Sequence, residues 1–309
     1  MKLVQRNSEG PKSSEKQRTM LVDLTNLCWI QRFSDFKKNS SYDPDAWMLF
    51  FQNILGKLNK IRSDYDINNI ILCDEGGNNW RKRVYSEYKA NRSIETDLYF
   101  DDVNYTKEKL HEFIQDYTNQ KFISVNQLEA DDLIAVYSQT YKDRDELILI
   151  VSTDRDFHQL LVQENVRQFD PMKFEEKEHD FSDIGFQLFL KCIRGDTGDN
   201  IGSAYPRVRE KKLREAWNEE SQYEMMNIMN INRKEDGLPV KDIYERNRQL
   251  IDLTQQPESL REKAKEGFES LQTSQHNYDI VQTRQWLKDH EFYSILEKYD
   301  QFEFLFKAL

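Results

Sequence analysis

Short apolar runs alternate with longer segments of helical periodicity over roughly the first 185 residues of the chain. The runs are typical of buried strands, and the segments between them repeat their apolar residues every three to four positions. Such alternation predicts an α/β fold with a mostly parallel central sheet flanked by helices. The predicted strands lie at 20–24, 70–74, 122–125, 147–154 and 166–170, and predicted helices lie at 44–62, around 103–118 and after 128.

The two ends of the chain follow different patterns. Residues 1–18 are polar and lack periodicity, so they are predicted to form a mobile tail. After about Ile184 the strand pattern fades, and the remaining apolar positions recur with a helical period. The predicted organisation is therefore a tail at 1–18, an α/β domain at 19–185 and a helical region at 186–309.

The composition is that of a soluble protein with a sizeable core. With 309 residues and 38% hydrophobic content, the chain can bury a large interior. No apolar segment has the length of a membrane span and no signal peptide is evident, so we expect a cytoplasmic protein without a membrane partner. The three cysteines are widely spaced in apolar runs, which disfavours both disulfides and a zinc site.

Acidic residues stand where three of the predicted strands end: Asp23, Asp74 and Asp154. Because the carboxyl ends of parallel strands meet at one edge of a sheet, these side chains are expected to face one crevice. Taken singly, each acid has an ordinary interpretation as a turn, a solvated loop or a favourable charge at a helix N-terminus. Further acids lie close to these in the predicted fold. Asp156 follows the fourth predicted strand, Glu129, Asp131 and Asp132 begin the predicted helix at LEADD (128–132), and Asp196 and Asp199 lie in the turn GDTGDN (195–200).

Together these acids favour a metal site. So many carboxylates in one crevice would repel one another and raise one another's pKa values unless cations neutralised them. Carboxylate oxygens without His or Cys favour Mg²⁺ or Mn²⁺ over zinc. A site of this size suggests two metal ions acting on a phosphodiester, where they activate a water and stabilise the departing oxygen.

Two basic segments lie close to these acids in the sequence. The first, at 78–92, interleaves cations with aromatic residues, as expected where a phosphate backbone and unstacked bases pass. The second follows GDTGDN and suits contacts with duplex phosphates. A solvated helix face is the ordinary alternative for each segment. The net charge of −11 does not exclude nucleic-acid binding, because a sum over the whole chain does not describe the local field at a basic segment. The cations are Arg81, Lys82, Arg83, Lys89 and Arg92 in the first segment, and Arg207, Arg209, Lys211, Lys212 and Arg214 in the second.

In this order, LVDLTN, ILCDEGGNNWRKRVYSEYKANR, LEADDLIAV, ILIVSTDRDFHQLL and IRGDTGDNI resemble the successive signatures of the flap-endonuclease/5′→3′ exonuclease family, including its phage replication branch. The resemblance covers roughly residues 20–202. It implies a Mg²⁺-dependent nuclease that removes 5′ ends, flaps and RNA primers, with a helical region that holds DNA. It also implies a monomer whose candidate partners are branched DNA, RNA–DNA hybrids, a sliding clamp and a single-strand-binding protein.

The resemblance assigns roles to individual residues. Lys89 and Arg92 resemble the basic residues that contact the scissile phosphate, whereas Arg81 and Tyr88 are weaker candidates for nucleic-acid contact. Asp132 also ranks lower because helical periodicity places it nearly opposite the apolar stripe of its helix. The metal ligands implied are Asp23, Asp74, Glu129, Asp131, Asp154, Asp156 and Asp199, with Asp132 and Asp196 as secondary members.

The chain departs from the family pattern after GDTGDN. Many relatives carry a Pro-Gly-Ile-Gly hairpin there, often with a monovalent ion, whereas this chain has IGSAYPRVREKK at 201–212. The departure argues against the monovalent site and for duplex binding through side-chain charge. Two other functions remain open: a non-catalytic protein that binds branched DNA on the same fold, and a PIN-like ribonuclease.

Overall fold

A six-stranded sheet forms the centre of the protein. The computed structural model describes residues 16–36, 46–91, 97–177, 183–231, 238–273 and 277–308. The strand order is β3-β2-β1-β4-β5-β6, and all neighbours are parallel except β5 and β6. The predicted α/β class with a mostly parallel sheet is therefore confirmed. The strands are β1 (Gln17–Asp23), β2 (Asn69–Glu75), β3 (Lys121–Val125), β4 (Glu146–Val151), β5 (Val166–Asp170) and β6 (Glu175–Glu176).

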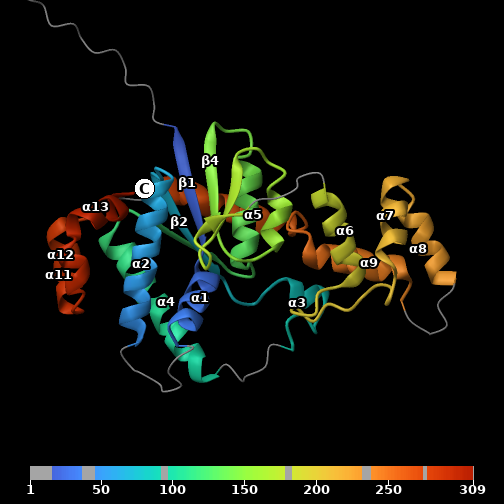
Figure 1. Cartoon of the computed structure of the whole chain (residues 1–309), viewed down its shortest axis with the longest axis horizontal. Helices are drawn as coiled ribbons and strands as arrows, with labels where there is room; N and C mark the ends of the chain where they lie inside the picture. The colour runs from blue at the N-terminus through green and yellow to red at the C-terminus, as the bar shows by residue number, and fades with distance from the viewer. Residues whose placement is uncertain are drawn as a thin grey trace, which may run out of the picture.

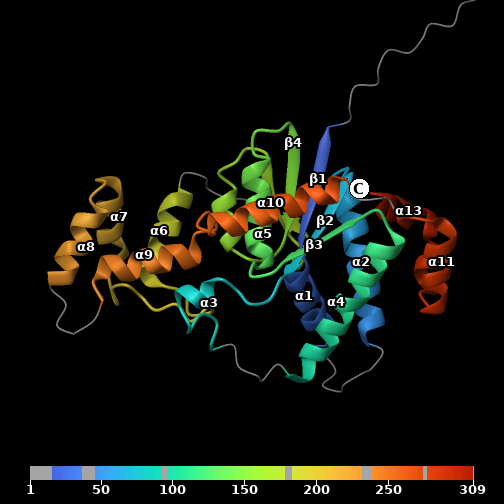
Figure 2. The same cartoon turned by 180° about the vertical axis from the view of Figure 1, so that it is seen from behind.

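The sheet has two apolar faces, each covered by its own helices (Figures 1 and 2). Alternate strand residues point to opposite faces, so Met20 and Val22 join one core while Leu21 joins the other. The first face is covered by α1 (Leu24–Phe36), α2 (Ala46–Asp64), α4 (Asp97–Tyr117) and the C-terminal helices α11 (Ile280–Asp289), α12 (Tyr293–Glu297) and α13 (Tyr299–Lys307). The second is covered by α5 (Ala130–Thr140), η2 (Asp156–Leu160) and α10 (Glu258–Gln272).

The strand order reverses at β1. The chain moves from β1 outward to β2 and β3, and then returns to β4 on the other side of β1. The helices α1 and α2 of the first connection pack on one face, and α5 of the return connection packs on the other. In open α/β sheets the ligand crevice forms at such a reversal, outside the carboxyl ends of the strands.

A helical lobe with its own core projects beyond the sheet (Figure 1). It contains α6 (Ile184–Arg194), α7 (Glu210–Asn218), α8 (Gln222–Ile231) and α9 (Val240–Ile251). The short α3 (Arg81–Val84) contacts α9 and bridges from the sheet to this lobe.

Two boundaries differ from the sequence-based division. β1 begins at Gln17, so Gln17 and Arg18 belong to the sheet and not to a tail, whereas residues 1–15 lie outside the described residues. The helices after Pro257 pack on the sheet: Phe268 of α10 lies in one core, and Trp286 and Phe306 lie in the other. The region 186–309 is thus divided between the helical lobe and the two faces of the sheet. Among the described helices, none is long and apolar enough to cross a membrane.

Candidate metal centre and nucleic-acid interface

Asp23, Asp154 and Asp156 lie at the carboxyl ends of β1 and β4, where the strand order reverses. Asp23 accepts hydrogen bonds from the backbone N–H of Asn26 (3.1 Å) and from Ser152 Oγ (3.1 Å). Ser152 Oγ also accepts a hydrogen bond from the N–H of Asp154 (3.1 Å), and a carboxylate oxygen of Asp154 accepts one from the N–H of Asp156 (2.9 Å). One chain of hydrogen bonds therefore connects the three acids.

Burial makes two of these acids, Asp23 and Asp156, difficult to ionise. Burial raises the pKa of Asp23 to about 7, and the nearby charges of Asp154 and Glu75 act in the same direction. Burial also raises the pKa of Asp156, with a further contribution from Asp154, although Lys191 opposes the shift. A bound cation would remove this electrostatic cost.

The LEADD segment both caps α5 and gathers carboxylates. Glu129 is the N-cap residue and forms a capping box with Asp132. One oxygen from each of Glu129, Asp131 and Asp132 lies within 4.8 Å of the others. The pKa of Asp131 is raised by burial and by Glu129 and Asp132. The pKa of Glu129 is lowered to about 2, because Lys89 and Arg81 outweigh the effect of burial.

Arg81 is buried inside the protein, so the prediction that it contacts nucleic acid is wrong. Only 1% of the residue is accessible, and its guanidinium binds both oxygens of Asp132 at 2.8 Å and Glu129 at 3.0 Å. Its Nε donates to the carbonyl of Leu250 at the end of α9 (2.9 Å). Trp80 and Tyr88 lie beside the guanidinium, with ring centroids 4.9 and 5.9 Å from Cζ. Arg81 therefore holds the carboxylates of LEADD in place.

Asp132 is fully buried, contrary to the expectation that it lies opposite the apolar stripe. Besides Arg81, it accepts hydrogen bonds from Trp80 Nε1 (3.1 Å) and from the N–H of Glu129 (3.1 Å). The periodicity argument failed because α5 is covered on several sides, by the sheet, α10 and the α3 segment. Both oxygens of Asp132 accept hydrogen bonds from these donors, so Asp132 fixes the position of Arg81 and of the Glu129 backbone.

Tyr88 also differs from its predicted role as a nucleic-acid contact. It is 2% accessible, and its hydroxyl lies 2.9 Å from Glu129 and 3.2 Å from Asp199. It therefore connects the α5 cluster to the GDTGDN turn. The next residue, Lys89, forms an ion pair with Glu129 and donates its backbone N–H to the carbonyl of Asp199 (2.9 Å).

Lys191 of α6 is a site residue that sequence reasoning missed. Its ammonium forms ion pairs with Asp156 and with Asp196, the latter at 2.7 Å. Burial lowers the pKa of Lys191, but these two carboxylates more than compensate and raise it. The available signal was a single cation inside the apolar run FLKCI, just before GDTGDN.

Asp74 lies at the end of β2 and is held by residues of α1 and α4, which cover the first face of the sheet. Lys107 Nζ of α4 lies 2.6 Å from its carboxylate, and Thr25 Oγ1 donates to it at 2.9 Å. Lys107 was also missed, because no local pattern relates it to an acid 33 positions earlier in the chain.

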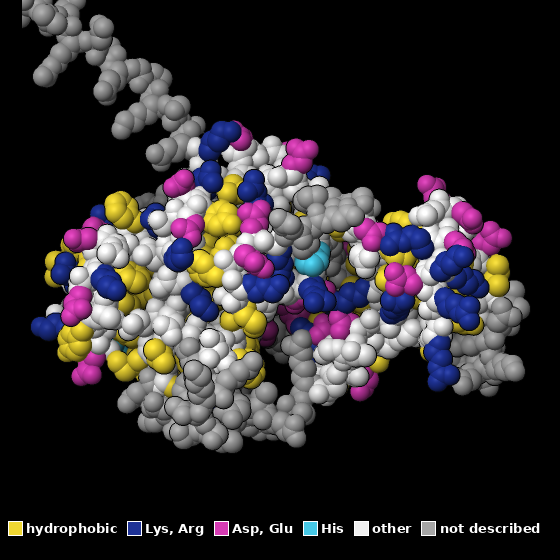
Figure 3. Space-filling view, viewed as in Figure 1, with side chains coloured by type: hydrophobic (Ala, Val, Ile, Leu, Met, Phe, Trp, Pro, Cys, Tyr) yellow, Lys and Arg dark blue, Asp and Glu magenta, His cyan; other side chains and the backbone are white. Residues whose placement is uncertain are grey.

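Six of the remaining predicted cations are exposed. Figure 3 shows basic side chains gathered over the helical lobe and along the hollow between this lobe and the sheet. A 630 Å³ cavity between η2 and α6 lies in this region and is lined by Arg155, Asp156, Lys191 and Arg194. Arg92 lies outside the described residues. The exposed predicted cations are Lys82, Arg83, Arg207, Arg209, Lys211 and Lys212.

The chain is similar in sequence to known nucleases. Residues 18–185 match a family model described as the 5′-3′ exonuclease, N-terminal resolvase-like domain. The chain is 26% identical to the flap endonuclease of Escherichia phage T5, over 62% of this chain and 67% of that protein. It is 29% identical to ribonuclease H of Enterobacteria phage T4, over 45% and 47% respectively. A 5′-3′ exonuclease of Buchnera aphidicola is 28% identical, and the match covers 58% of its length.

Solved structures share the fold. A bacteriophage T5 protein crystallised with metal ions superposes with a TM-score of 0.60 at 20% identity, over 82% of this chain and 99% of that chain. The T5 flap endonuclease in a complex with DNA and metal ions also gives 0.60, at 19% identity over 83% of this chain. The likeness thus includes much of the helical part of the chain.

Replacing Arg81 should destabilise the protein strongly. Arg81→Met would leave the buried charge of Asp132 without its counterion and Glu129 with Lys89 as its remaining ion-pair partner. Breaking a buried pair in this way costs about 3–5 kcal/mol. Urea unfolding should show this loss, whereas Arg83→Met, two positions away and exposed, should change stability by less than about 0.5 kcal/mol. Adding Asp132→Leu to Arg81→Met should recover part of the loss. Equal stabilities of the two single variants would contradict the role of Arg81.

The raised pKa of Asp23 predicts a specific pH dependence of stability. Between the ordinary pKa near 3.8 and the folded value of about 7, the folded protein retains a proton that the unfolded chain releases. Stability without metal should therefore fall as pH rises through this window, by at most about 1.4 kcal/mol per pH unit. Urea unfolding in EDTA from pH 4 to 8 should show a steeper fall for wild type than for Asp23→Asn. Parallel profiles would exclude the shift.

Proposed function

Because the chain belongs to the 5′-3′ exonuclease family, whose N-terminal domain model matches residues 18–185, we propose that it is a Mg²⁺-dependent, structure-specific 5′ nuclease. It hydrolyses phosphodiesters with two metal ions, and Mn²⁺ substitutes for Mg²⁺. Its substrates are 5′ ends, 5′ flaps and RNA primers in branched DNA or RNA–DNA hybrids during phage replication.

The observation that carries this proposal is the crowding of carboxylates at the carboxyl ends of β1 and β4 and at the start of α5. Asp23, Asp131 and Asp156 all have raised pKa values, so the protein on its own leaves negative charge poorly compensated there. The donor set consists of carboxylate oxygens, which suits Mg²⁺ or Mn²⁺. The residues that would hold the ions are Asp23, Asp74, Glu129, Asp131, Asp154, Asp156 and Asp199, with Asp196 as a further member.

The metal ions, when bound, lower the pKa of a water and stabilise charge on the scissile phosphate. The protein's own cations complete the site. Lys89 is partly exposed beside Glu129, where its ammonium can reach a phosphate that enters the crevice. Arg92, three residues later, is assigned the same role through the family motif. Lys191 neutralises Asp156 and Asp196, and its ammonium can also turn towards a substrate phosphate.

The helical lobe is proposed to hold the duplex part of the substrate. Its exposed cations Arg207, Arg209, Lys211 and Lys212 follow the GDTGDN turn directly, and Lys82 and Arg83 lie on the neighbouring α3. The turn is tight, because Asp196 and Ile201 exchange backbone hydrogen bonds of 2.9 and 2.7 Å. Gly195 adopts a φ of 77° there, and a Cβ atom would lie 2.2 Å from the Ile201 carbonyl oxygen. The turn therefore fixes where the basic segment begins relative to the acids.

A cytoplasmic location, a monomeric state, and a sliding clamp or single-strand-binding protein as partners stay predictions. The absence of a monovalent-ion site likewise stays a prediction. A non-catalytic role in binding branched DNA is less favoured, because every expected ligand position carries an acid. A PIN-like ribonuclease is less favoured because the α6–α9 lobe supplies an extended basic surface beside the crevice.

Removing one acid of the β4 turn should separate catalysis from binding. Asp154→Asn or Asp156→Asn should abolish Mg²⁺-dependent cleavage of an end-labelled 5′-flap substrate, because each removes an anionic metal ligand, while DNA affinity measured in Ca²⁺ or EDTA stays nearly unchanged. Asp143→Asn, an exposed acid before β4, is the matched control and should cleave as wild type does. Cleavage at the wild-type rate by both active-site variants would refute the metal assignment.

Removing charge from the lobe should weaken duplex binding without changing the chemistry. For Arg207→Ala/Arg209→Ala we expect the slope of log affinity against log salt to fall by about 1.8, or about 0.9 for each phosphate that is no longer neutralised. Lys263→Ala/Lys288→Ala removes two exposed cations from α10 and α11 and should leave the slope unchanged. Fluorescence anisotropy on a nicked duplex measures both variants. An unaltered slope for the first pair would remove the lobe from the duplex interface.

A further inference from the structure

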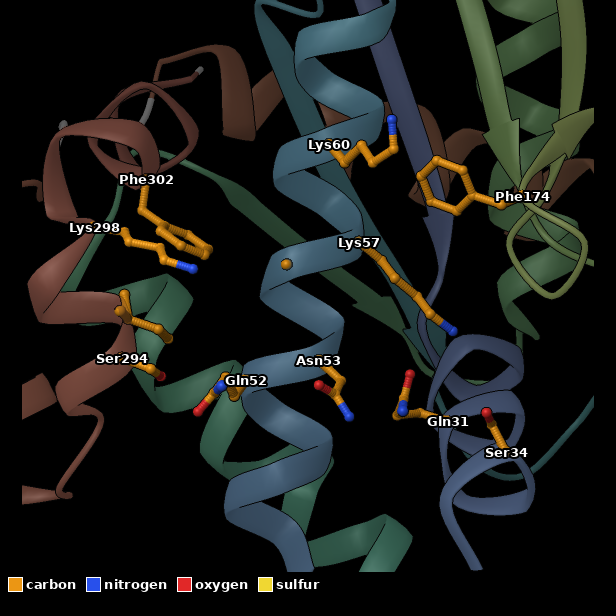
Figure 4. A pocket seen from close by; sticks show the side chains of 12 residues that line it. Gln31, Ser34, Gln52, Asn53, Lys57, Lys60, Phe174, Ser294, Lys298 and Phe302 are labelled. Carbon is orange, nitrogen blue, oxygen red and sulfur yellow. The ribbon is translucent and has the colours of Figure 1, made fainter. Parts of the chain in front are cut away.

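A trough crosses the outer surface of α2, on the face of the sheet opposite α5 and α10 (Figure 4). It has a volume of 480 Å³ and includes none of the acids of the candidate metal centre. Figure 4 shows side chains of α1 and Phe174 on one side of α2, and Ser294, Lys298 and Phe302 on the other. The volume lies within the range of about 300–1,000 Å³ that is typical of ligand sites.

The trough is basic in a chain of net charge −11. Lys57, Lys60 and Lys298 line it, and its described lining contains no acid. Lys60 also pairs with Asp64 at 3.0 Å, one turn further along α2 and outside the lining. The remaining polar lining consists of neutral amides and hydroxyls, which can both donate and accept hydrogen bonds. An anionic ligand with additional polar groups fits such a lining.

Gly56 forms part of the trough in the interior of the 19-residue helix α2. A glycine at such a position destabilises a helix by about 1 kcal/mol relative to alanine. Packing does not require it, because a Cβ atom at Gly56 would meet no atom of the described structure within 4 Å. Because Gly56 has no side chain, the trough stays open where it crosses the helix, and a ligand can lie directly across α2.

Aromatic rings flank the trough on both sides of α2. Phe174 and Phe302 are partly buried. Each ring packs against the core on one part of its surface and is accessible to solvent on another. Lys60 Nζ lies 5.1 Å from the centroid of Phe174, which places a cation beside a ring. Cations next to aromatic rings along a groove are the arrangement that binds single-stranded nucleic acid, through phosphate contacts and base stacking.

We propose that this trough binds a single strand of nucleic acid that lies across Gly56. The lysines contact its phosphates, and unpaired bases stack on Phe174 and Phe302. An acidic peptide would satisfy the lysines but would leave the two rings without a stacking partner. The site goes beyond the proposed nuclease activity, because it shares no residue with the carboxylate cluster and does not require cleavage.

The test compares two substitutions at Gly56. Gly56→Ala and Gly56→Gln both improve helix propensity and meet no neighbouring atom at Cβ, so both should fold and unfold at slightly higher urea concentration than wild type. Gly56→Ala should retain binding of a fluorescent oligo-dT in EDTA. Gly56→Gln places a long side chain across the trough and should weaken binding roughly fivefold or more, the loss of about one stacked base. Equal affinities of the two variants would overturn the proposal.

Charge reversal and crosslinking locate the strand. Lys57→Glu/Lys298→Glu should lower the salt slope of oligo-dT binding by about 1.4, or about 0.7 for each phosphate that these lysines neutralise. Lys263→Glu/Lys288→Glu, which reverses two exposed lysines elsewhere, should leave the slope unchanged. Oligo-dT with 5-iodouracil should crosslink to peptides that contain Phe174 or Phe302. Crosslinks confined to the helical lobe and the carboxylate crevice would refute the site.

Two further measurements separate this proposal from its alternatives. If poly-glutamate binding is lost in Gly56→Gln while oligo-dT binding persists, the trough is a peptide site and the proposal fails. Cleavage of the 5′-flap substrate in Mg²⁺ is measured in parallel with wild-type protein. Absence of cleavage would reject the nuclease proposal alone, whereas cleavage combined with unaltered oligo-dT binding in every trough variant would reject the strand site alone.

Discussion

Negative charge held close together and partly out of water is the constraint on which this structure depends. Carboxylates cannot be gathered at the ends of buried strands unless other groups offset their repulsion and loss of hydration. Four cations do so in the described structure: Arg81, Lys89, Lys107 and Lys191 each contact at least one acid of the cluster. They come from three separate parts of the chain, the segment 78–92, α4 and α6, so the fold as a whole holds the acids together.

Arg81 also joins the candidate metal centre to the helical lobe. Its guanidinium binds the acids of LEADD, and its Nε binds the last turn of α9. Gln159 contacts the same end of α9 through the carbonyl of Ile251 (3.1 Å) and the N–H of Leu253 (2.8 Å). These contacts attach the end of α9 to α3, which precedes Lys89 in the chain, and to η2, which begins at Asp156. The basic surface of the lobe is thereby held at a defined position relative to the crevice.

The trough on α2 differs from the crevice in its electrostatics. In the crevice, buried acids raise one another's pKa values, and cations of the protein are shared among them. In the trough, partly or fully exposed lysines stand beside neutral amides and accessible rings. The first arrangement suits small divalent cations, whereas the second suits a polyanion with apolar surfaces. The branched substrate proposed for this protein would offer both a phosphate to be cleaved and strands to be held, so the two surfaces are compatible with one ligand.

The sequence by itself determined the sheet and the positions of its acids. Strand periodicity placed Asp23, Asp74 and Asp154 at carboxyl ends, and parallel pairing then requires those ends to meet. The spacing of LEADD likewise located a helix start with concentrated charge. These features are local, so a one-dimensional pattern contains them.

Only the tertiary structure decided which charged residues are buried and with which partners. Three residues of types that usually lie at a protein surface are buried here: Arg81, Tyr88 and Asp132. They are enclosed where the α3 segment meets the start of α5 and the end of α9. Lys107 and Lys191 pair with acids 33 and 35 positions away, and the helices after Pro257 return to cover the sheet. Burial and pairing between distant segments depend on how helices pack in three dimensions, which periodicity along the chain does not specify.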